Sequence, residues 1–328
     1  MVKPVRTGYL ASPLAHRPWG NIVTEPVITE IATGLQFPEG PVWMPDGTVL
    51  CVELKGRTVD RVHPDGTVEV IASPGGSPNG LAIGPDGAGY VCNSGGWSFT
   101  EIMGLTLPDT HQADDYSGGR IERIDLATGE VTVLYTECDG NPLMGPNDLV
   151  FDAAGGMWFT DHGKVRARER DHGGVYYAAP DGSSITEVAY PLESPNGIGL
   201  SPDGDRVYVA ETHTGRVYWW PVVGRGQLGK PSPLGAGGQL LAGVPGLQLF
   251  DSLGVDSAGN VVVGTLGNGG LTVIPPEGEP VEHIPLPDPL VTNVCFGGDD
   301  LSTAFITCSG TGKLVSMPWP RPGLALAF

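Results

Sequence analysis

Short apolar runs alternate with turn signals along almost the whole chain. Runs such as "TVLCVE" (48–53) and "RVYVAE" (206–211) each follow a turn rich in aspartate and glycine. A second alternating run comes next, as in "TVDRVHPDG" and "RIERIDLATG". Aspartate and glycine between two such runs predict β-hairpins. No segment combines helical length with the helical period, so the pattern predicts an all-β fold.

Six segments share one order of residue types: a polar residue, four or five mostly apolar residues, and an Asp/Gly turn. They read "PEGPVWMPDG" (38–47), "PNGLAIGPDG" (78–87), "PNDLVFDAAG" (146–155), "PNGIGLSPDG" (195–204), "FDSLGVDSAG" (250–259) and "TNVCFGGDD" (292–300). Their first polar residues, here called the head residues, are Glu39, Asn79, Asn147, Asn196, Asp251 and Asn293. A repeat of four strands in about 40–55 residues is typical of one propeller blade, so six blades are expected.

The two ends of the chain indicate how such a ring closes. The last repeat ends one strand short of a full blade, and "EPVITEIAT" (25–33) precedes the first repeat. We therefore expect a six-bladed β-propeller of four-stranded antiparallel blades over residues 25–328, with the N-terminal strand closing the last blade. An N-terminal arm (1–24) precedes this single domain, and the extra length between the second and third repeats predicts a long loop at 94–119.

Composition and charge narrow the possible partners. Gly 51 and Pro 31 among 328 residues fit a fold dense in turns, because apolar runs recur throughout. A net charge of −19 argues against a nucleic-acid partner, which needs clustered Lys and Arg. No apolar run reaches the roughly 18 residues of a membrane span, and the N-terminus does not resemble a signal peptide. We expect a cytoplasmic protein without membrane partners, whose five cysteines, lacking any CxxC pair, are reduced.

The head residues occupy equivalent places in the predicted blades, on the innermost strands, and therefore form a ring around the central channel. All six carry side-chain oxygens and two are carboxylates, which are the ligands that hard divalent cations prefer. Asn-Gly and Pro-Asn are also ordinary turn dipeptides. A plain turn does not require Glu39 in one copy and Asp251 in another, so the set as a whole favours a metal ring.

With "FPEGPVW", "GPNDLVFDAAGGMWFTD" and "SPNGIGLSPDGDRVYVAET", these repeats resemble the senescence marker protein/gluconolactonase family from about residue 31 to about residue 318. The resemblance implies one divalent metal in the channel of a six-bladed propeller, usually calcium, and the hydrolysis of lactones. Mg²⁺, Mn²⁺, Zn²⁺ and Fe²⁺ are alternative metals. By position in the family's motifs, it implies Glu39, Asn147, Asn196 and Asp251 as metal ligands.

The expected reaction opens a lactone, or a related ester, to a hydroxy acid. The metal polarises the carbonyl, and Asp251 either activates water or attacks as a nucleophile. We expect the substrate to contact Asn79, Trp97, Asp148, His162, Phe250 and Asn293. Some sugar lactonases of the family have an arginine where this chain has Gly145. Together with Phe250 and the aromatic residues of 94–119, this makes an aromatic or aliphatic lactone or ester a rival to a sugar lactone.

Other functions stay open at this point. The same scaffold could carry another metal-dependent enzyme, such as an esterase, organophosphate hydrolase, lyase or isomerase, or a non-catalytic ligand-binding propeller. His162 and His213 are candidate acid–base groups, although lone loop histidines are more often structural. We expect 160–162 to lie away from the ring, on the other side of the blade or in the loop beyond it. We expect "KVRARERDH" (164–172) to form a solvated loop.

Overall fold

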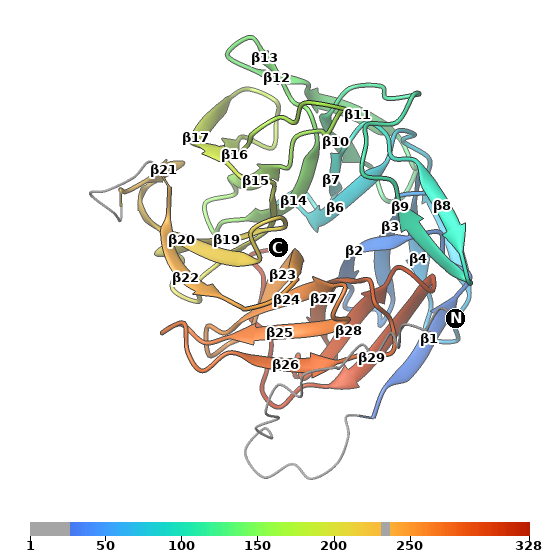
Figure 1. Cartoon of the computed structure of the whole chain (residues 1–328). Helices are drawn as coiled ribbons and strands as arrows, with labels where there is room; N and C mark the ends of the chain where they lie inside the picture. The colour runs from blue at the N-terminus through green and yellow to red at the C-terminus, as the bar shows by residue number, and fades with distance from the viewer. Residues whose placement is uncertain (1–26, 231–236) are drawn as a thin grey trace, which may run out of the picture.

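Six small antiparallel sheets surround a central axis in the computed structural model, which describes residues 27–230 and 237–328 (Figure 1). No helix occurs among these residues. The prediction of an all-β, six-bladed propeller is therefore confirmed.

Each blade starts with its innermost strand. Blade 1 contains β2 (Pro38–Trp43), β3 (Val49–Glu53), β4 (Thr58–Val62) and β5 (Val68–Ala72). Blade 2 contains β6 (Pro78–Ile83), β7 (Gly89–Asn93), β10 (Arg120–Ile124) and β11 (Val131–Tyr135). Blade 3 contains β14 (Pro146–Phe151), β15 (Met157–Asp161), β16 (Gly173–Ala178) and β17 (Ile185–Leu192).

The second half of the ring is built in the same way. Blade 4 contains β18 (Pro195–Leu200), β19 (Arg206–Glu211), β20 (Arg216–Gly224) and β22 (Gln239–Gly243), with β21 (Gln227–Leu228) paired to the end of β20. Blade 5 contains β23 (Leu249–Val255), β24 (Val261–Leu266), β25 (Gly270–Ile274) and β26 (Glu282–Pro285). Blade 6 contains β27 (Val291–Gly297), β28 (Thr303–Cys308), β29 (Lys313–Pro318) and β1 (Thr29–Thr33).

The ring closes through its first strand. β1 runs antiparallel to β29, with Thr29 opposite Ser316 and Thr33 opposite Lys313. The N-terminal strand is thus the outermost strand of the last blade, as the sequence predicted. The predicted arm at 1–24 lies outside the described residues.

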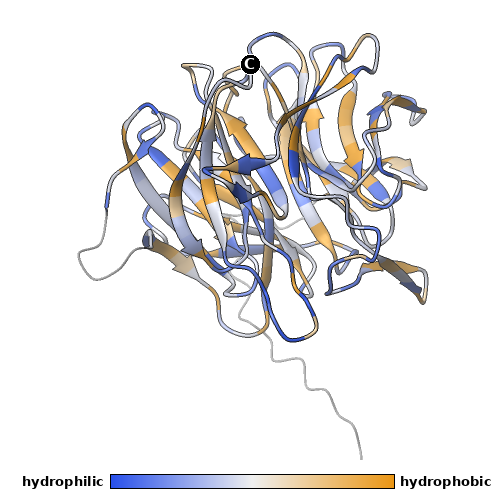
Figure 2. Ribbon diagram, turned by 90° about the horizontal axis from the view of Figure 1, so that it is seen from above, coloured by the Kyte–Doolittle hydropathy of each residue, from blue (hydrophilic) through white to orange (hydrophobic). Residues whose placement is uncertain are grey.

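The hydrophobic core lies between blades. The described residues form six buried clusters, and each cluster joins side chains of two neighbouring blades. Between blades 2 and 3, for example, Tyr90 and Ile121 pack in one cluster with Phe159. Figure 2 shows the apolar residues concentrated on the strands and the polar residues in the turns. Because every blade shares its core with both neighbours, the ring is stabilised as one unit.

The innermost strands pack directly on one another around the axis. A glycine often follows the head residue, and the packing explains it. A Cβ added to Gly80 would lie 2.6 Å from the carbonyl oxygen of Asn147, and one added to Gly197 would lie 2.6 Å from the backbone nitrogen of Leu253. Glycine therefore permits the close approach that brings neighbouring head residues together.

The segment 94–119 is more ordered than the predicted loop. It contains a hairpin of β8 (Phe99–Ile102) and β9 (Leu105–Pro108). The backbone N–H of Thr106 donates to the carbonyl of Gly310, and Glu101 pairs with Lys55. The hairpin therefore extends from blade 2 over blades 1 and 6, as Figure 1 shows. A second small hairpin, β12 (Glu137–Cys138) and β13 (Asn141–Pro142), connects blade 2 to blade 3.

The C-terminal segment crosses the end of the ring opposite the head residues. The N–H of Leu324 donates to the carbonyl of Val255, and Phe328 packs edge-on against Phe151, with 6.1 Å between ring centroids. Val255 and Phe151 are the last residues of inner strands β23 and β14. The end that carries the head residues is therefore the side from which a ligand would enter.

All five cysteines are free, as predicted. No helix in the described part of the chain is long and apolar enough to cross a membrane.

Candidate metal centre and catalytic site

A register shift marks the head of every inner strand. In blades 1 and 4 the pairing is interrupted between Glu39 and Val42 and between Pro195 and Ile198, and the other four blades are interrupted at the equivalent place. Bulges bend a strand locally and re-aim its side chains. The repeated bulge therefore explains how a head residue at the start of a strand leaves the regular pleat.

Glu39 is almost completely buried, with 2% of its surface exposed. Its Oε2 accepts hydrogen bonds from the Gly40 backbone N–H (2.6 Å) and from Asn293 Nδ2 (2.8 Å). Asn293 in turn accepts the Val294 N–H through its Oδ1. Asn293 thus orients the Glu39 carboxylate across the boundary between blades 1 and 6.

Three oxygens of the head residues have no hydrogen-bond partner among the described residues although they are buried. They are Glu39 Oε1, Asn79 Oδ1 and Asn147 Oδ1. A buried polar atom without a partner costs about 1–3 kcal/mol, so three of them in one ring need a reason. Oxygens that converge on a cation have such a reason, because the cation replaces the missing donors.

Asp251 lies beside Asn196 from the preceding blade. Hydrogen bonds from the Asn196 side chain and the Ser252 backbone favour its ionised form. Asn196 is itself held by two contacts, since its Nδ2 donates to Thr212 Oγ1 (3.1 Å) and its Oδ1 accepts from Ser252 Oγ (3.2 Å). The two predicted ligands are therefore fixed relative to each other.

Three buried carboxyl groups from blades 1, 3 and 5 interact electrostatically. Burial raises the pKa of Glu39 to about 7. Burial and the nearby Glu39 raise the pKa of Asp148 to about 8 and that of Asp251 well above its usual range. Blades 1 and 5 are not neighbours, so the interaction of Glu39 with Asp251 places these side chains together near the axis.

Asp148 differs from the other two acids in its partners. Its Oδ1 accepts the Leu149 N–H (2.9 Å) and its Oδ2 accepts the Ile198 N–H (3.2 Å), which joins blade 3 to blade 4. The described residues contain no group of three or more His, Cys, Asp and Glu side chains arranged to hold a metal. The donor set predicted from the sequence combines two carboxylates, Glu39 and Asp251, with amide oxygens from asparagines. This set suits a hard divalent cation such as Ca²⁺.

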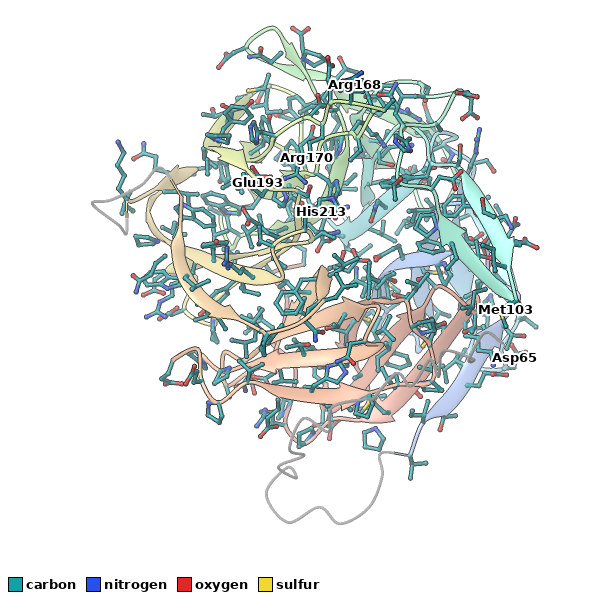
Figure 3. The ribbon with its side chains drawn as sticks, in the orientation of Figure 1. Asp65, Met103, Arg168, Arg170, Glu193 and His213 are labelled. Atoms are coloured by element: carbon teal, nitrogen blue, oxygen red, sulfur yellow. The ribbon has the colours of Figure 1, made fainter. Side chains whose placement is uncertain are left out.

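The other predicted substrate contacts lie in different surroundings. Trp97 is half-buried, with 6.5 Å between its ring centroid and that of His162. His162 is also 5.8 Å from His213, again between ring centroids. In Figure 3, His213 lies toward the centre of the ring, whereas Met103 lies at its outer edge. Phe250 has no exposed surface and packs in the core of blades 4 and 5, so it does not line the mouth of the channel.

The position expected for 160–162 requires a correction. Asp161 pairs with Pro146, so the end of β15 lies at the same end of the blade as the head residue Asn147. Because β15 runs antiparallel to β14, it ends where β14 begins. Thr160 Oγ1 donates to the Asn196 carbonyl (2.6 Å), and the Asp161 carboxylate accepts the N–H groups of Met144, Gly145 and Gly163. These residues support the site directly.

The expected solvated loop at 164–172 is also partly wrong. Lys164 is 4% exposed, and Arg166 forms two hydrogen bonds with Asp171. Residues 167–170 and 172 are exposed, and the rest of the segment is buried or partly buried. Sequence reasoning missed Lys164 because its partners, Gly96 and Trp97, come from a distant part of the chain.

Comparison with known proteins identifies the family. Residues 37–310 match the family model described as the SMP-30/Gluconolactonase/LRE-like region. The chain belongs to this family. A lactonase drp35 of Staphylococcus saprophyticus subsp. saprophyticus is 30% identical over 270 residues, which is 81% of this chain and 75% of the relative.

Two further relatives of the SMP-30/gluconolactonase family extend the comparison. A gluconolactonase of Zymomonas mobilis subsp. mobilis is 28% identical over 312 residues, which is 86% of this chain and 79% of that protein. The solved structure of a gluconolactonase from Xanthomonas campestris has a TM-score of 0.70 and 27% identity, and the match covers 89% of each chain. The family resemblance seen in the sequence is therefore confirmed.

Proposed function

We propose that this chain is a lactonase that depends on one divalent cation, most simply Ca²⁺, held by Glu39, Asn147, Asn196 and Asp251. Membership of the SMP-30/gluconolactonase family, with relatives named gluconolactonase and lactonase, supports hydrolysis of a lactone. A bound cation would polarise the lactone carbonyl and stabilise negative charge on its oxygen.

The observation that carries the metal assignment is the set of buried oxygens without partners. Glu39 Oε1 and Asn147 Oδ1 belong to the proposed ligands, and Asn79 Oδ1 lies in the ring beside them. The carboxyl groups of Glu39 and Asp251 add to this, since each raises the other's cost of ionisation in the buried site. A divalent cation held by Glu39 and Asp251 would offset that cost and favour the ionised form of both groups.

Asp251 is the residue that we assign to proton transfer. It is 9% exposed, and Asn196 and the Ser252 backbone orient it by hydrogen bonds. As a general base it accepts a proton from the attacking water, and it later returns that proton to the ring oxygen that leaves. Burial limits its contact with bulk water, so the proton stays within the site.

The proposal is tested by following acid release from a panel of sugar, aliphatic and aromatic lactones in a pH-stat. The wild-type chain should release acid from at least one of them, lose this activity in EGTA and regain it with CaCl₂. Asp251→Asn should abolish turnover while calcium still binds, as measured by calorimetry. Near-normal turnover by this variant, or activity that survives exhaustive chelation, would contradict the assignment.

A second measurement separates the two possible roles of Asp251. In a single turnover in H₂¹⁸O, a general base places the heavy oxygen in the product carboxylate. A nucleophilic Asp251 instead forms a mixed anhydride with the acyl group and releases the ring oxygen, and water that then attacks the Asp251 carbonyl of this anhydride leaves the heavy oxygen in the protein. Mass spectrometry of the peptide that contains residue 251 distinguishes the two outcomes.

A further inference from the structure

A small pocket lies beside the predicted metal site. It is lined by Trp97 and by residues 110–112 and 162–165. None of the described residues that line it is acidic, although the chain has 37 Asp and Glu against 18 Lys and Arg. Lys164 supplies a positive charge to this lining, and the carboxylates of Asp161 and Asp171 act on it from outside the lining.

Lys164 is buried without an ion-pair partner. Its Nζ donates to the carbonyl of Gly96 (3.1 Å), and it lies 4.8 Å from the ring centroid of Trp97 and 5.4 Å from that of Tyr116. The carboxylates of Asp161 and Asp171 favour its charged form electrostatically, but among the ion pairs of the described residues Asp171 pairs with Arg166. One carbonyl and two aromatic faces leave donor capacity on Nζ, because an ammonium group has three N–H bonds.

Two further polar atoms at the pocket have no partner among the described residues. Trp97 Nε1 and Gln112 Oε1 are both buried and unpaired. The indole N–H is a donor only, and the amide of Gln112 presents a donor when it rotates by 180°. Lys164 and Trp97 thus offer donors to the same small space, and Gln112 adds one once its amide has rotated.

The pocket is pre-formed by its backbone. The N–H of Lys164 donates to Asp171 Oδ2 (3.1 Å), and the N–H of Asp171 donates back to the Lys164 carbonyl (2.9 Å). The N–H of Gln112 donates to the carbonyl of Val165 (2.8 Å). These bonds fix the two segments that carry Lys164 and Gln112. The free volume of about 10 Å³ has room for about one water molecule, so the side chains at its mouth must move to admit a carboxylate.

The pocket lies on the rim of the channel, at the end that carries the head residues. The backbone N–H of Trp97 donates to Ser77 Oγ (3.0 Å), two residues before Asn79. His162 follows the pair of Asp161 with Pro146, next to Asn147. Burial and His213 lower the pKa of His162 to about 3, so this ring is neutral and Lys164 alone charges the pocket. Burial lowers the pKa of Lys164 to about 8, which leaves it mostly charged at pH 7.

We propose that Lys164, Trp97 and Gln112 bind a carboxylate on the substrate while its lactone carbonyl reaches the metal site. A buried ammonium group that makes a single hydrogen bond, to a carbonyl, gains from a ligand that adds charged acceptors, and the two oxygens of a carboxylate can accept from more than one donor. This inference rests on the proposed lactonase function and assigns its substrate to lactones that carry an acidic group.

The test uses γ-butyrolactone and two derivatives that carry a carboxylate on the γ-carbon, directly or through one methylene group. The calcium-loaded wild-type chain should hydrolyse at least one charged lactone with the higher kcat/KM. Lys164→Met should lower kcat/KM for that lactone about 10- to 100-fold, mainly through KM, because a hydrogen bond to a charged group contributes about 1.5–3 kcal/mol. Its effect on γ-butyrolactone should stay within about twofold.

Matched variants separate recognition from general effects. Lys55→Met removes the same charge from an exposed ion pair at the same end of the ring and should change neither substrate. Lys164→Arg keeps the charge and should recover part of the loss, and Trp97→Phe removes the indole N–H while it keeps the ring. An equal loss on charged and neutral lactones, or no loss on either, would overturn the proposal.

A binding measurement keeps the inference testable if no lactone is hydrolysed. The probe is 2-hydroxyglutarate, which is the product expected from the directly carboxylated lactone. Calorimetry should show that it binds the wild-type chain and binds Lys164→Met about 10-fold or more weakly, with thermal melting confirming that the variant is folded. Binding without hydrolysis would contradict the proposed lactonase function but support the carboxylate site at Lys164. Equal binding by the wild-type chain and Lys164→Met would contradict the carboxylate site.

Discussion

Glu39→Gln offers a sharp test of the metal ring, because the structure predicts opposite effects with and without a cation. In the wild-type chain, Glu39 Oε2 accepts two hydrogen bonds and Oε1 has no partner among the described residues. A glutamine keeps an acceptor for Gly40 and Asn293. It loses the charge and places an amide NH₂ where the cation would bind.

The size of the effect without metal follows from the pKa of Glu39. Burial raises this pKa from 4.5 to about 7. Stability from the protonated group is fully present below pH 4.5 and is lost as the pH rises to about 7, which amounts to about 3 kcal/mol. In EGTA, the melting temperature of the wild-type chain should therefore fall between pH 5 and pH 8, and Glu39→Gln should reduce that fall.

The size of the effect with metal follows from mass action. At a calcium concentration about 100 times Kd, binding stabilises the folded chain by about 2.7 kcal/mol, which raises the melting temperature of a chain of this size by about 4 °C. Glu39→Gln should remove most of this rise, because the site loses one of its two charges.

The assay is thermal unfolding in EGTA and in CaCl₂ from pH 5 to pH 8. Glu53→Gln is the matched control, since burial also raises the pKa of Glu53 to about 7 but this residue lies outside the ring. Glu53→Gln should change the pH dependence of the melting temperature but keep the rise in melting temperature that calcium causes. If Glu39→Gln retained the full calcium response, the ring would not be the metal site.

Three further predictions concern the scaffold. Gly80→Ala should cost about 1–3 kcal/mol of stability and weaken calcium binding, because its Cβ would meet backbone atoms of Asn147 and Asp148. Gly89→Ala is the control, because its Cβ would meet only side chains, which can move. Equal melting temperatures of the two variants would contradict this prediction. Asp161→Asn should cost about 1–3 kcal/mol in a denaturant titration, because three backbone N–H groups depend on its carboxylate. Removing residues 1–33 should abolish cooperative unfolding by opening blade 6, while removing 1–24 should leave it intact.

Periodic features were predictable from the sequence because every blade repeats them. The six head residues and the closing strand at the N-terminus each follow from one repeated pattern, and the structure places them as expected. The β8–β9 hairpin was missed although Met103–Gly104 supplies a turn, with positive φ at both residues. Its signal is short and occurs in one blade only.

Features that depend on contacts between blades were not predictable in this way. Asp148 was a candidate substrate contact, and only the packing of blade 3 on blade 4 shows that its oxygens accept backbone N–H groups. Lys164 is buried by rings far away in the sequence. The roles assigned to the site residues and the cytoplasmic location stay predictions.

The central claim is that the blade heads assemble one cation site, and anomalous diffraction from crystals grown with Ca²⁺ or Mn²⁺ tests it most directly. We predict a single strong peak on the channel axis, within about 2.3–2.6 Å of oxygens from Glu39, Asn147, Asn196 and Asp251 when Ca²⁺ is bound. A channel without a peak, with Glu39 Oε1 and Asn147 Oδ1 bonded to ordered waters instead, would contradict the account.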